Sequence, residues 1–379
     1  MPPKSASAKS AKSNRAKRTA NQAKRSETSV KPVKEDVSTI PLELQQLLLN
    51  VFRNSFSNRF GSDLKPLLQE VKQHLYNRDF LSAFGKDEYL EAYVVRWSPS
   101  RALGYLQILG DLEDHIFVSK ELGAKRNPHD LRIACIGGGA GAEIVGLAGF
   151  LKLLAEKHAP PEDGQTKDSN SGTSEKAPAS STQPRFEVSA IDIANWSPIV
   201  ASLQNAITTS PPLSKYASNT AKEANTKLLH PDSFNTESLQ QDVLTMPVAD
   251  LSVQLQDADL ITIMFTLNEL YTSSLPKTQA FLMKLTGYLR PGSLLLVVDS
   301  PGSYSTVTLN GAEKQYPMHW LLDHTLLSVP KDAKSKDESP KWEKILTDES
   351  RWFRLPEVLK YPIDLENMRY QIHLYRRTA

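Results

Sequence analysis

The sequence predicts an α/β protein with a largely parallel sheet and helices on both of its faces, preceded by a helical N-terminal subdomain and a disordered basic tail. From residue 131 onward, short apolar runs alternate with helical segments, which is the pattern of βαβ units. The first of these runs ends in a glycine-rich turn that leads into a helix. Before residue 116, apolar residues recur at helical spacing instead.

The composition fits a folded protein of a reducing compartment. The chain has 379 residues and a hydrophobic fraction of 40%, enough for a core in two modest domains or one decorated domain. Its single cysteine, Cys135, excludes an internal disulfide, which fits the cytosol or the nucleus. No apolar run reaches the roughly 18 residues of a transmembrane helix. The N-terminus has no apolar signal core, so we expect neither a membrane partner nor secretion.

The positive charge is concentrated at the N-terminus. Residues 1–34 carry ten lysines and arginines and one acid, a net charge of +9, although the whole chain carries +2. This Ser/Ala/Lys-rich segment has no aromatic residue and cannot bury a core, so we expect residues 1–38 to be disordered. Such a tail is typical of a nuclear or nucleolar address or of a polyanion-binding arm, with a solubilising tail as the alternative. We therefore expect a nuclear or nucleolar location, with the cytoplasm as a further one.

Two regions are expected after the tail. Residues 39–128 are predicted to form the helical subdomain, in which a helix starts at Pro99 behind a Ser98 cap. Residues 129–379 are predicted to form the α/β domain, interrupted by polar surface inserts near residues 160–184, 208–231 and 330–341. Its expected strands are residues 132–136, 186–191, 259–265, 293–298, 342–346 with 352–355, and 370–376, and its clearest helices are residues 142–157 and 275–289.

The glycine turn is the first candidate site. Gly137, Gly139 and Gly141 are spaced as G-x-G-x-G directly after an apolar run. Glycine permits the tight bend and lets a ligand lie on the backbone. The turn therefore favours a nucleotide-like cofactor at the carboxyl end of the first strand. Ordinary turns also use glycine, so the motif gains weight from the residues that follow it.

Two acids follow the next strands. Asp192 ends the second expected strand, where an acid in nucleotide-binding α/β folds accepts hydrogen bonds from ribose hydroxyls. Its separation from the turn exceeds the usual ~20 residues because of the polar insert between them. Asp242 stands before an apolar pair and is a candidate for the adenine amino group. The alternatives are a helix-capping role for Asp192 and a turn-forming role for Asp242.

Polar residues also follow the two most apolar strands. Asn268 and Glu269 come just past the strand expected at 259–265, in the crevice where open α/β sheets bind substrates. We expect Asn268 to orient a base edge and Glu269 to accept a proton or contact the cofactor; helix capping is the alternative for both. Asp299 ends the strand expected at 293–298, and Tyr304 lies in an expected loop that borders the substrate.

The order of these features resembles the class I S-adenosylmethionine-dependent methyltransferases over about residues 130–379. The resemblance implies a Rossmann-like sheet and S-adenosylmethionine (SAM) as the cofactor. One position departs from the pattern, because these enzymes often carry an acid two residues before the first glycine and this chain has Cys135 there. The polar contact of that acid must come from elsewhere, either from Glu143 or from the helical subdomain.

Three segments are similar to the fungal 25S ribosomal RNA uridine-N3 methyltransferases: Arg96-Trp-Ser-Pro-Ser-Arg-Ala-Leu-Gly-Tyr105, Gly137-Gly-Gly-Ala-Gly-Ala-Glu143 and Phe265-Thr-Leu-Asn-Glu-Leu-Tyr271. This resemblance implies methylation of N3 of a uridine in large-subunit rRNA, with the rRNA or a pre-ribosomal particle as partner. Since uracil N3 carries a proton, Glu269 is the candidate base and Asp299 the reserve. The alternative for Glu269 is a contact with the cationic cofactor.

The aromatic and basic residues of these segments leave more than one interpretation open. An extruded base needs a cage, for which Trp97, Tyr105, Tyr271 and Tyr304 are candidates, with core packing as the alternative for each. Arg96 and Arg101 either close over the cofactor, contact RNA phosphates, or form surface ion pairs.

Other classes of function remain open at this stage. The acceptor of the methyl group can be a protein or a small molecule, since only the acceptor would differ. A non-catalytic ribosome-assembly factor that keeps the fold is a further alternative, favoured by Cys135. A metal site is not expected, because the eight histidines show no ligand spacing.

Overall fold

The computed structural model describes residues 39–118, 129–158, 183–213, 215–223, 225–302, 304–309, 312–328 and 340–378. The described residues from Ile40 onward belong to one compact unit. The expected disordered tail lies outside the described residues. So do most of the inserts expected near 160–184 and 330–341. The insert near 208–231 is largely described and contains the short helix α9, Asn219–Glu223.

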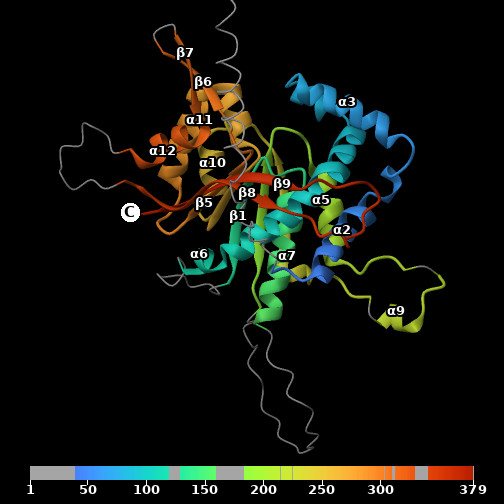
Figure 1. The fold of residues 1–379 in the computed structure, drawn as a ribbon. Coiled ribbons are helices and arrows are strands. Elements are labelled where there is room, and N and C mark those ends of the chain that lie inside the picture. The colour runs from blue at the N-terminus through green and yellow to red at the C-terminus, as the bar shows by residue number, and fades with distance from the viewer. Residues whose placement is uncertain are drawn as a thin grey trace, which may run out of the picture. The chain divides into compact units, whose positions relative to one another are not determined.

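A seven-stranded sheet with the order β3-β2-β1-β4-β5-β9-β8 is the centre of the molecule (Figure 1). Strands β1 to β5 are parallel, and β9 is antiparallel to both of its neighbours, β5 and β8. The order reverses at β1, so the connections that leave β1 and β4 run to opposite faces of the sheet. In open α/β sheets a ligand crevice lies at such a point. The strands are β1 (Leu131–Ile136), β2 (Phe186–Asp192), β3 (Phe234–Gln240), β4 (Leu260–Met264), β5 (Leu294–Asp299), β8 (Trp342–Phe353) and β9 (Met368–Arg377).

Helices cover both faces of the sheet, as the sequence predicts. Alternate residues of a strand point to opposite faces: Ile133 and Cys135 of β1 join one core, and Ala134 and Ile136 join the other. The first core also contains residues of α2 (Leu42–Ser55), α3 (Leu64–Tyr76), α5 (Asp87–Asp111), α7 (Ala142–Lys157) and α8 (Ser197–Thr208). The second contains residues of α10 (Val248–Leu255), α11 (Leu267–Tyr288) and α12 (Met318–Leu327). The remaining described helices are η1 (Ser57–Arg59), α4 (Phe80–Ala83), α6 (Glu113–Val118) and η2 (Pro231–Ser233).

Helix α7 connects the N-terminal helices to the sheet. It is apolar nearly all round, as expected of a helix enclosed on more than one side, and it contacts both α2 and α5. Gly146 lets α5 approach closely, since a Cβ at this position would lie 3.1 Å from the carbonyl oxygen of Ala102. The N-terminal helical segment (residues 39–118) and the sheet therefore share one hydrophobic core.

The helix expected to start at Pro99 does not start there, because α5 runs through this residue. Proline has no N–H to donate within the helix, which leaves the carbonyl of Val95 without its usual donor. The hydroxyl of Tyr361 donates to that carbonyl instead, at 3.2 Å. Ser98 is no cap, and its hydroxyl donates to the carbonyl oxygen of Ala140 in the glycine turn at 2.7 Å.

Three other boundaries differ from the sequence prediction. Helix α11 begins at Leu267 rather than at 275 and is kinked at Ser274, which has non-helical dihedral angles. Tyr304 is not in a loop, because it begins strand β6 (Tyr304–Leu309), which pairs with β7 (Ala312–Pro317) in a separate hairpin. The two late apolar runs form one strand, β8, with two register irregularities.

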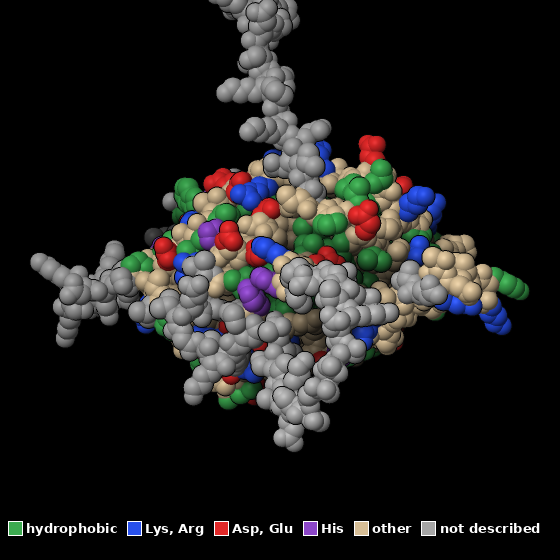
Figure 2. All heavy atoms as spheres, turned by 90° about the horizontal axis from the view of Figure 1, so that it is seen from below, with side chains coloured by type: hydrophobic (Ala, Val, Ile, Leu, Met, Phe, Trp, Pro, Cys, Tyr) green, Lys and Arg blue, Asp and Glu red, His purple; other side chains and the backbone are tan. Residues whose placement is uncertain are grey.

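The surface of the described residues carries both signs of charge. On the face drawn in Figure 2, lysine and arginine side chains are interspersed with acids wherever grey atoms do not cover the surface. Among the described helices, none combines the length and the apolar character that crossing a bilayer requires.

Candidate functional site

The three glycines predicted as a site form one turn between β1 and α7. Gly137 (φ 76°) and Gly141 (φ 80°) adopt left-handed backbone conformations that other residues rarely tolerate. The Gly137 N–H donates to the carbonyl oxygen of Ile191 on β2 at 2.8 Å. A Cβ on Gly137 would lie 2.3 Å from the Thr266 hydroxyl oxygen, beyond the end of β4. The turn is therefore packed against both neighbouring strands.

Asp192 lies at the end of β2, directly beside the turn. Its carboxylate accepts hydrogen bonds from the N–H groups of Gly139 and Ala194, both at 3.2 Å. Burial raises the pKa of Asp192, and these hydrogen bonds oppose the rise. Acid, strand end and glycine turn are thus together as the sequence predicts, and the contact with ribose hydroxyls stays a prediction.

Asp242 lies in the turn after β3, and its carboxylate closes that turn. One oxygen accepts the N–H of Leu244 at 2.9 Å and the other accepts the Thr245 hydroxyl at 3.0 Å. This geometry matches the turn-forming alternative. The predicted contact with adenine therefore competes with bonds that Asp242 already makes.

Glu143 places a carboxyl group beside Cys135, the position at which the sequence lacks the expected acid. It lies in the first turn of α7, is 4% exposed, and accepts the Thr262 hydroxyl at 2.5 Å. Its other oxygen lies beside Cys135, because a Cβ built on Gly138 would be 2.6 Å from both Glu143 Oε2 and Cys135 Cβ. Burial raises the pKa of Glu143 to about 8, which the Thr262 hydrogen bond opposes and the charge of Asp192 reinforces. The geometry favours Glu143 over the helical segment as the source of this polar contact.

Asp299, at the end of β5, holds the start of α11. It is 3% exposed and accepts the N–H groups of Asn268 at 3.0 Å and Ser300 at 2.7 Å. The charged oxygen caps a helix whose own N-cap residue, Thr266, makes no capping bond through its side chain. Burial raises the pKa of Asp299 to about 6, and the two N–H groups oppose the rise.

Asn268 and Glu269 lie on the first turn of α11, the turn that Asp299 caps. Both have a buried oxygen, Asn268 Oδ1 and Glu269 Oε2, that makes no hydrogen bond among the described residues. Burial raises the pKa of Glu269. Arg78, which follows α3, opposes this rise with a guanidinium nitrogen 3.7 Å from Glu269 Oε2. Asn268 Oδ1 is therefore without a hydrogen bond among the described residues, and Glu269 Oε2 is approached only by the ion pair with Arg78.

Arg101 is a cation of the site that reaches it from α5. Its guanidinium donates to the Tyr93 hydroxyl at 2.9 Å and lies 4.7 Å from the ring centroid of Phe265. Phe265 directly follows β4 and has φ 57°, a conformation that is rare for a non-glycine residue and that clusters at functional sites. The role of Arg101 in closing over the cofactor stays a prediction, whereas Arg96 pairs with Glu366, which matches the ion-pair alternative.

An aromatic cluster covers the glycine turn. Its members are in contact at centroid distances of 4.8–6.0 Å: Phe84, Tyr93, Trp97 and Trp196. Trp196 lies on Gly139, since a Cβ there would be 2.0 Å from the indole. Tyr105 and Tyr271 are instead buried in the two hydrophobic cores, so core packing is their role.

Several residues around the carboxyl ends of the strands, called the carboxyl edge below, were not predicted from the sequence. Arg78 and Tyr93 come from the helical segment, where nothing in their spacing marks a site, and Thr262 is hidden inside an apolar strand. Pro198 in the first turn of α8 is a local signal for the helix start at Ser197, and that start places Trp196 next to the glycine turn.

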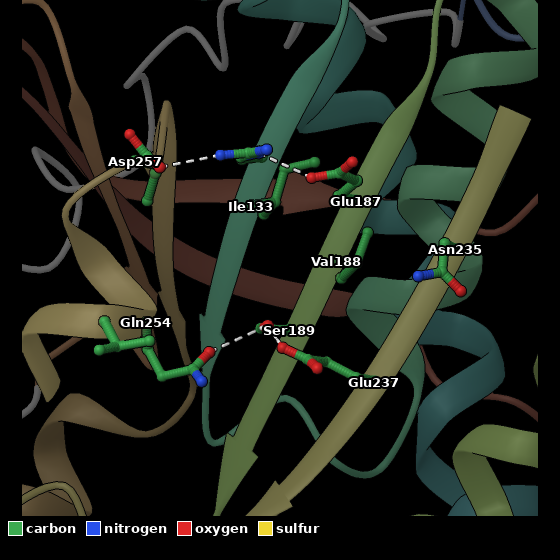
Figure 3. A pocket seen from close by; sticks show the side chains of 11 residues that line it. Ile133, Glu187, Val188, Ser189, Asn235, Glu237, Gln254 and Asp257 are labelled. Atoms are coloured by element: carbon green, nitrogen blue, oxygen red, sulfur yellow. Dashed lines mark hydrogen bonds and ion pairs between the residues drawn. The ribbon is translucent and has the colours of Figure 1, made fainter. Parts of the chain in front are cut away.

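A separate cavity of about 240 Å³ lies on the β1–β2–β3 face, beside α10 (Figure 3). Arg132 is paired there with Glu187 and Asp257, and Ser189 is hydrogen-bonded to Glu237 and Gln254. These polar groups satisfy one another away from the carboxyl ends of the strands.

No group of three or more possible metal ligands occurs within the described part of the chain.

Comparison with known proteins gives the family. Residues 52–376 match the family described as "Putative SAM-dependent methyltransferase". The 25S rRNA (uridine(2843)-N(3))-methyltransferase of Saccharomyces cerevisiae is 32% identical over 347 residues, which cover 89% of this chain and 86% of the yeast protein. The chain belongs to this family of SAM-dependent methyltransferases.

Solved methyltransferase structures also match, with low identity. Human N-acetylserotonin methyltransferase in complex with SAM is 12% identical, covering 88% of this chain and 71% of that one, with a TM-score of 0.33. SAM-bound CalS10, an amino pentose methyltransferase from Micromonospora echinaspora, is 12% identical, covering 73% and 94%, with a TM-score of 0.30.

The carboxyl edge suits SAM chemically. SAM carries a nucleoside, an ammonium group and a sulfonium, and it supplies the methyl group. Asp192 offers acceptors for ribose hydroxyls, and the glycine turn offers bare backbone beside them. Glu143 offers a buried carboxyl group to a cation, which would stabilise its ionised form.

We predict that Asp192→Ala weakens SAM binding by about ten- to a hundredfold, because hydrogen bonds to a charged acceptor are lost. Isothermal titration calorimetry measures this loss. Asp242→Ala is the matched control and should lose clearly less affinity, since its carboxylate closes its own turn. Unchanged affinity in the Asp192 variant would contradict the site.

We predict that SAM binding at pH 7 releases a proton from Glu143, whose pKa is raised to about 8 without a bound cation. The released proton is measured from the dependence of the binding enthalpy on the ionisation enthalpy of the buffer. Glu143→Gln should abolish the release, and an unchanged release would assign the proton to another group.

The same shift makes a prediction for stability. The folded pKa lies above the unfolded value of 4.5, so the contribution of Glu143 to folding is lost as pH rises from about 4.5 to 8. Without cofactor, Glu143→Gln should therefore be less sensitive to pH over this window, with a higher melting temperature than the parent at pH 8. A parent and a variant with parallel profiles would argue against the raised pKa.

Proposed function

We propose that the chain methylates N3 of a uridine in large-subunit ribosomal RNA. The yeast relative carries the proposal, because its 32% identity extends over 89% of this chain and so includes both the helical segment and the sheet. Shared cofactor binding alone does not require similarity in the helical segment. In this chain that segment contributes Arg78, Tyr93 and Arg101 to the carboxyl edge.

The reaction requires a base for the N3 proton, and Glu269 fits that role better than Asp299. Both oxygens of Asp299 are engaged by N–H groups of the backbone. Glu269 keeps Oε2 without a hydrogen bond, and burial raises its pKa toward the range that suits a general base. In the proposed step Glu269 takes the N3 proton, N3 bonds to the methyl carbon, and the electron pair of the broken bond stays on sulfur.

Asn268 is proposed to orient the uracil. Its backbone N–H is fixed by Asp299, while its side-chain Oδ1 remains without a partner among the described residues. A side-chain amide can donate and accept, which suits an imide edge that presents both kinds of group. Glu269 and Asn268 are neighbours on one rigid helix turn, so proton acceptor and orienting group keep a fixed separation.

The basic N-terminal tail fits the same proposal. A charge of +9 over residues 1–34 would attract rRNA and would suit a nuclear or nucleolar address. We propose the nucleolus as the working location. Imaging of the tagged full chain beside a chain that lacks residues 1–34 tests this, and identical nucleolar signals would remove the tail from the proposal.

The decisive experiment supplies the purified chain with methyl-labelled SAM and unmodified large-subunit rRNA, followed by digestion to nucleosides and mass spectrometry. We expect label in 3-methyluridine. Label in another nucleoside, or in a protein of a pre-ribosomal particle, would refute the proposed acceptor. No transfer despite measured SAM binding would support a role in ribosome assembly without catalysis.

We predict that Glu269→Gln lowers kcat by about 10²–10⁴-fold, because general-base catalysis is lost while the shape of the side chain is kept. The affinity for SAM should stay within about twofold. In the parent, kcat should rise with pH until it passes the raised pKa of Glu269, since only the ionised carboxylate accepts the proton.

Asp299→Asn is the matched control for this variant. It keeps an oxygen at the start of α11, so we expect a smaller loss and a retained pH profile. A larger loss than in Glu269→Gln would exchange the roles of the two acids.

A further inference from the structure

An exposed tryptophan near the end of β8 has the guanidinium groups of two arginines over its ring. Trp352 is 50% exposed, and the guanidinium carbons of Arg354 and Arg369 lie 5.1 Å and 5.7 Å from its ring centroid. Arg369 of β9 is the direct cross-strand partner of Trp352. Arg354 is two residues further along the chain and so falls on the same side of an extended segment.

Neither arginine is neutralised within the part of the chain that the structure describes, where neither makes an ion pair with a carboxylate. Arg369 is held in place by two hydrogen bonds to the Ser350 hydroxyl, at 2.9 and 3.1 Å. Of the acids near this end of β8, Asp348 pairs with Arg351. Glu349 lies 3.6 Å from His319, a pair that is ionic only when the histidine is protonated. The charge directly over Trp352 is therefore that of the two arginines.

The strand geometry presents these three side chains to solvent. β8 is the last strand of the sheet, and its pairing with β9 is irregular between Asp348 and Arg351, just before Trp352. Such an irregularity bends an edge strand and re-aims its side chains. The next residue, Phe353, is 5% exposed and packs in the core, which anchors the strand from behind.

The register of the sheet gives the position of Trp352 relative to the predicted site at the start of α11. β9 is antiparallel to β5, and Gln371 pairs with Asp299. Arg369 and Trp352 lie two residues further, beyond the carboxyl end of β5, and one strand further out. Strand spacing and rise give a separation of roughly 12 Å between Trp352 and Asp299. Asp299 caps the helix turn that carries Asn268 and Glu269, so an RNA strand that places its target base at this turn would reach Trp352 within a few nucleotides.

We propose that Trp352, Arg354 and Arg369 form a stacking platform for an unpaired nucleotide of the RNA substrate that lies near the target uridine. The two guanidinium groups lie over the indole. Their planes offer a base a flat surface to stack on, supported by the ring, and their charge is offered to the flanking phosphates. This proposal rests on the proposed function in RNA methylation.

RNA is favoured over a protein partner by the combination of groups. A protein docking surface is usually a patch with an apolar centre and a polar rim, whereas here two arginines without an ion pair lie over one exposed aromatic ring. Aromatic stacking tolerates any base, so the platform would hold the strand in register and leave the choice of base to the site at α11.

The test measures binding of the full chain to a fluorescein-labelled rRNA fragment that the parent methylates, by fluorescence anisotropy. Trp352→Ala should weaken binding by about five- to a hundredfold, the range of one lost stacking interaction. Trp352→Phe keeps a stacking face and should stay within a few-fold of the parent. The double change Arg354→Ala with Arg369→Ala should reduce the slope of log Kd against log salt by about 1.4.

Two controls separate a local effect from a general one. Tyr216→Ala removes a 96% exposed aromatic after α8, a helix that runs back from the carboxyl edge, and should leave RNA binding unchanged. SAM affinity should be unchanged in every variant.

The outcomes distinguish this proposal from the one it rests on. If the parent methylates and binds the fragment but Trp352→Ala does so equally well, the platform is wrong and the proposed function stands. If the parent neither binds nor methylates RNA, both fail. Equal losses in the Ala and Phe variants would show that RNA binding does not depend on an aromatic stacking surface and would also overturn the platform.

Discussion

The close packing of Gly137 against Thr266 is the constraint on which the site depends. A left-handed backbone at Gly137 turns the chain out of β1, and the absence of a side chain lets the end of β4 come within contact. The same residue donates to Ile191 of β2. Three strand ends are thereby held at one point, and Asp192 and Glu143 are positioned around it. Any larger residue at Gly137 would push β4 away from the turn.

This geometry gathers carboxyl groups that are costly to bury together. Burial raises the pKa values of Asp192, Asp299 and Glu143. The charge of Asp192 raises the pKa of Glu143 further. Arg101 offsets part of this cost, as its charge lowers the pKa of both Glu143 and Asp299. The raised pKa of Glu143 keeps its carboxyl group protonated at neutral pH, and a nearby cation would favour the ionised form. Perturbed pKa values of this kind are common at functional sites.

Periodicity and turn chemistry predicted the sheet, the helical segment and the glycine turn with Asp192, because each depends on local sequence. Contacts between distant segments could not be predicted. The approach of Arg78 to Glu269 and the cover of Trp196 over Gly139 arise only when α3, α8 and α11 pack on the sheet. The prediction that a helix starts at Pro99 was wrong. The carbonyl of Val95, which Pro99 leaves without a donor, accepts the hydroxyl of Tyr361, a residue far along the chain.

A crystal structure of the chain with S-adenosylhomocysteine tests the central claim most directly. The account predicts the ligand at the carboxyl ends of β1 and β2, with ribose hydroxyls on Asp192 and its ammonium group near Glu143. A ligand in the polar cavity between β1, β3 and α10, or one at the carboxyl edge that touches neither acid, would contradict it.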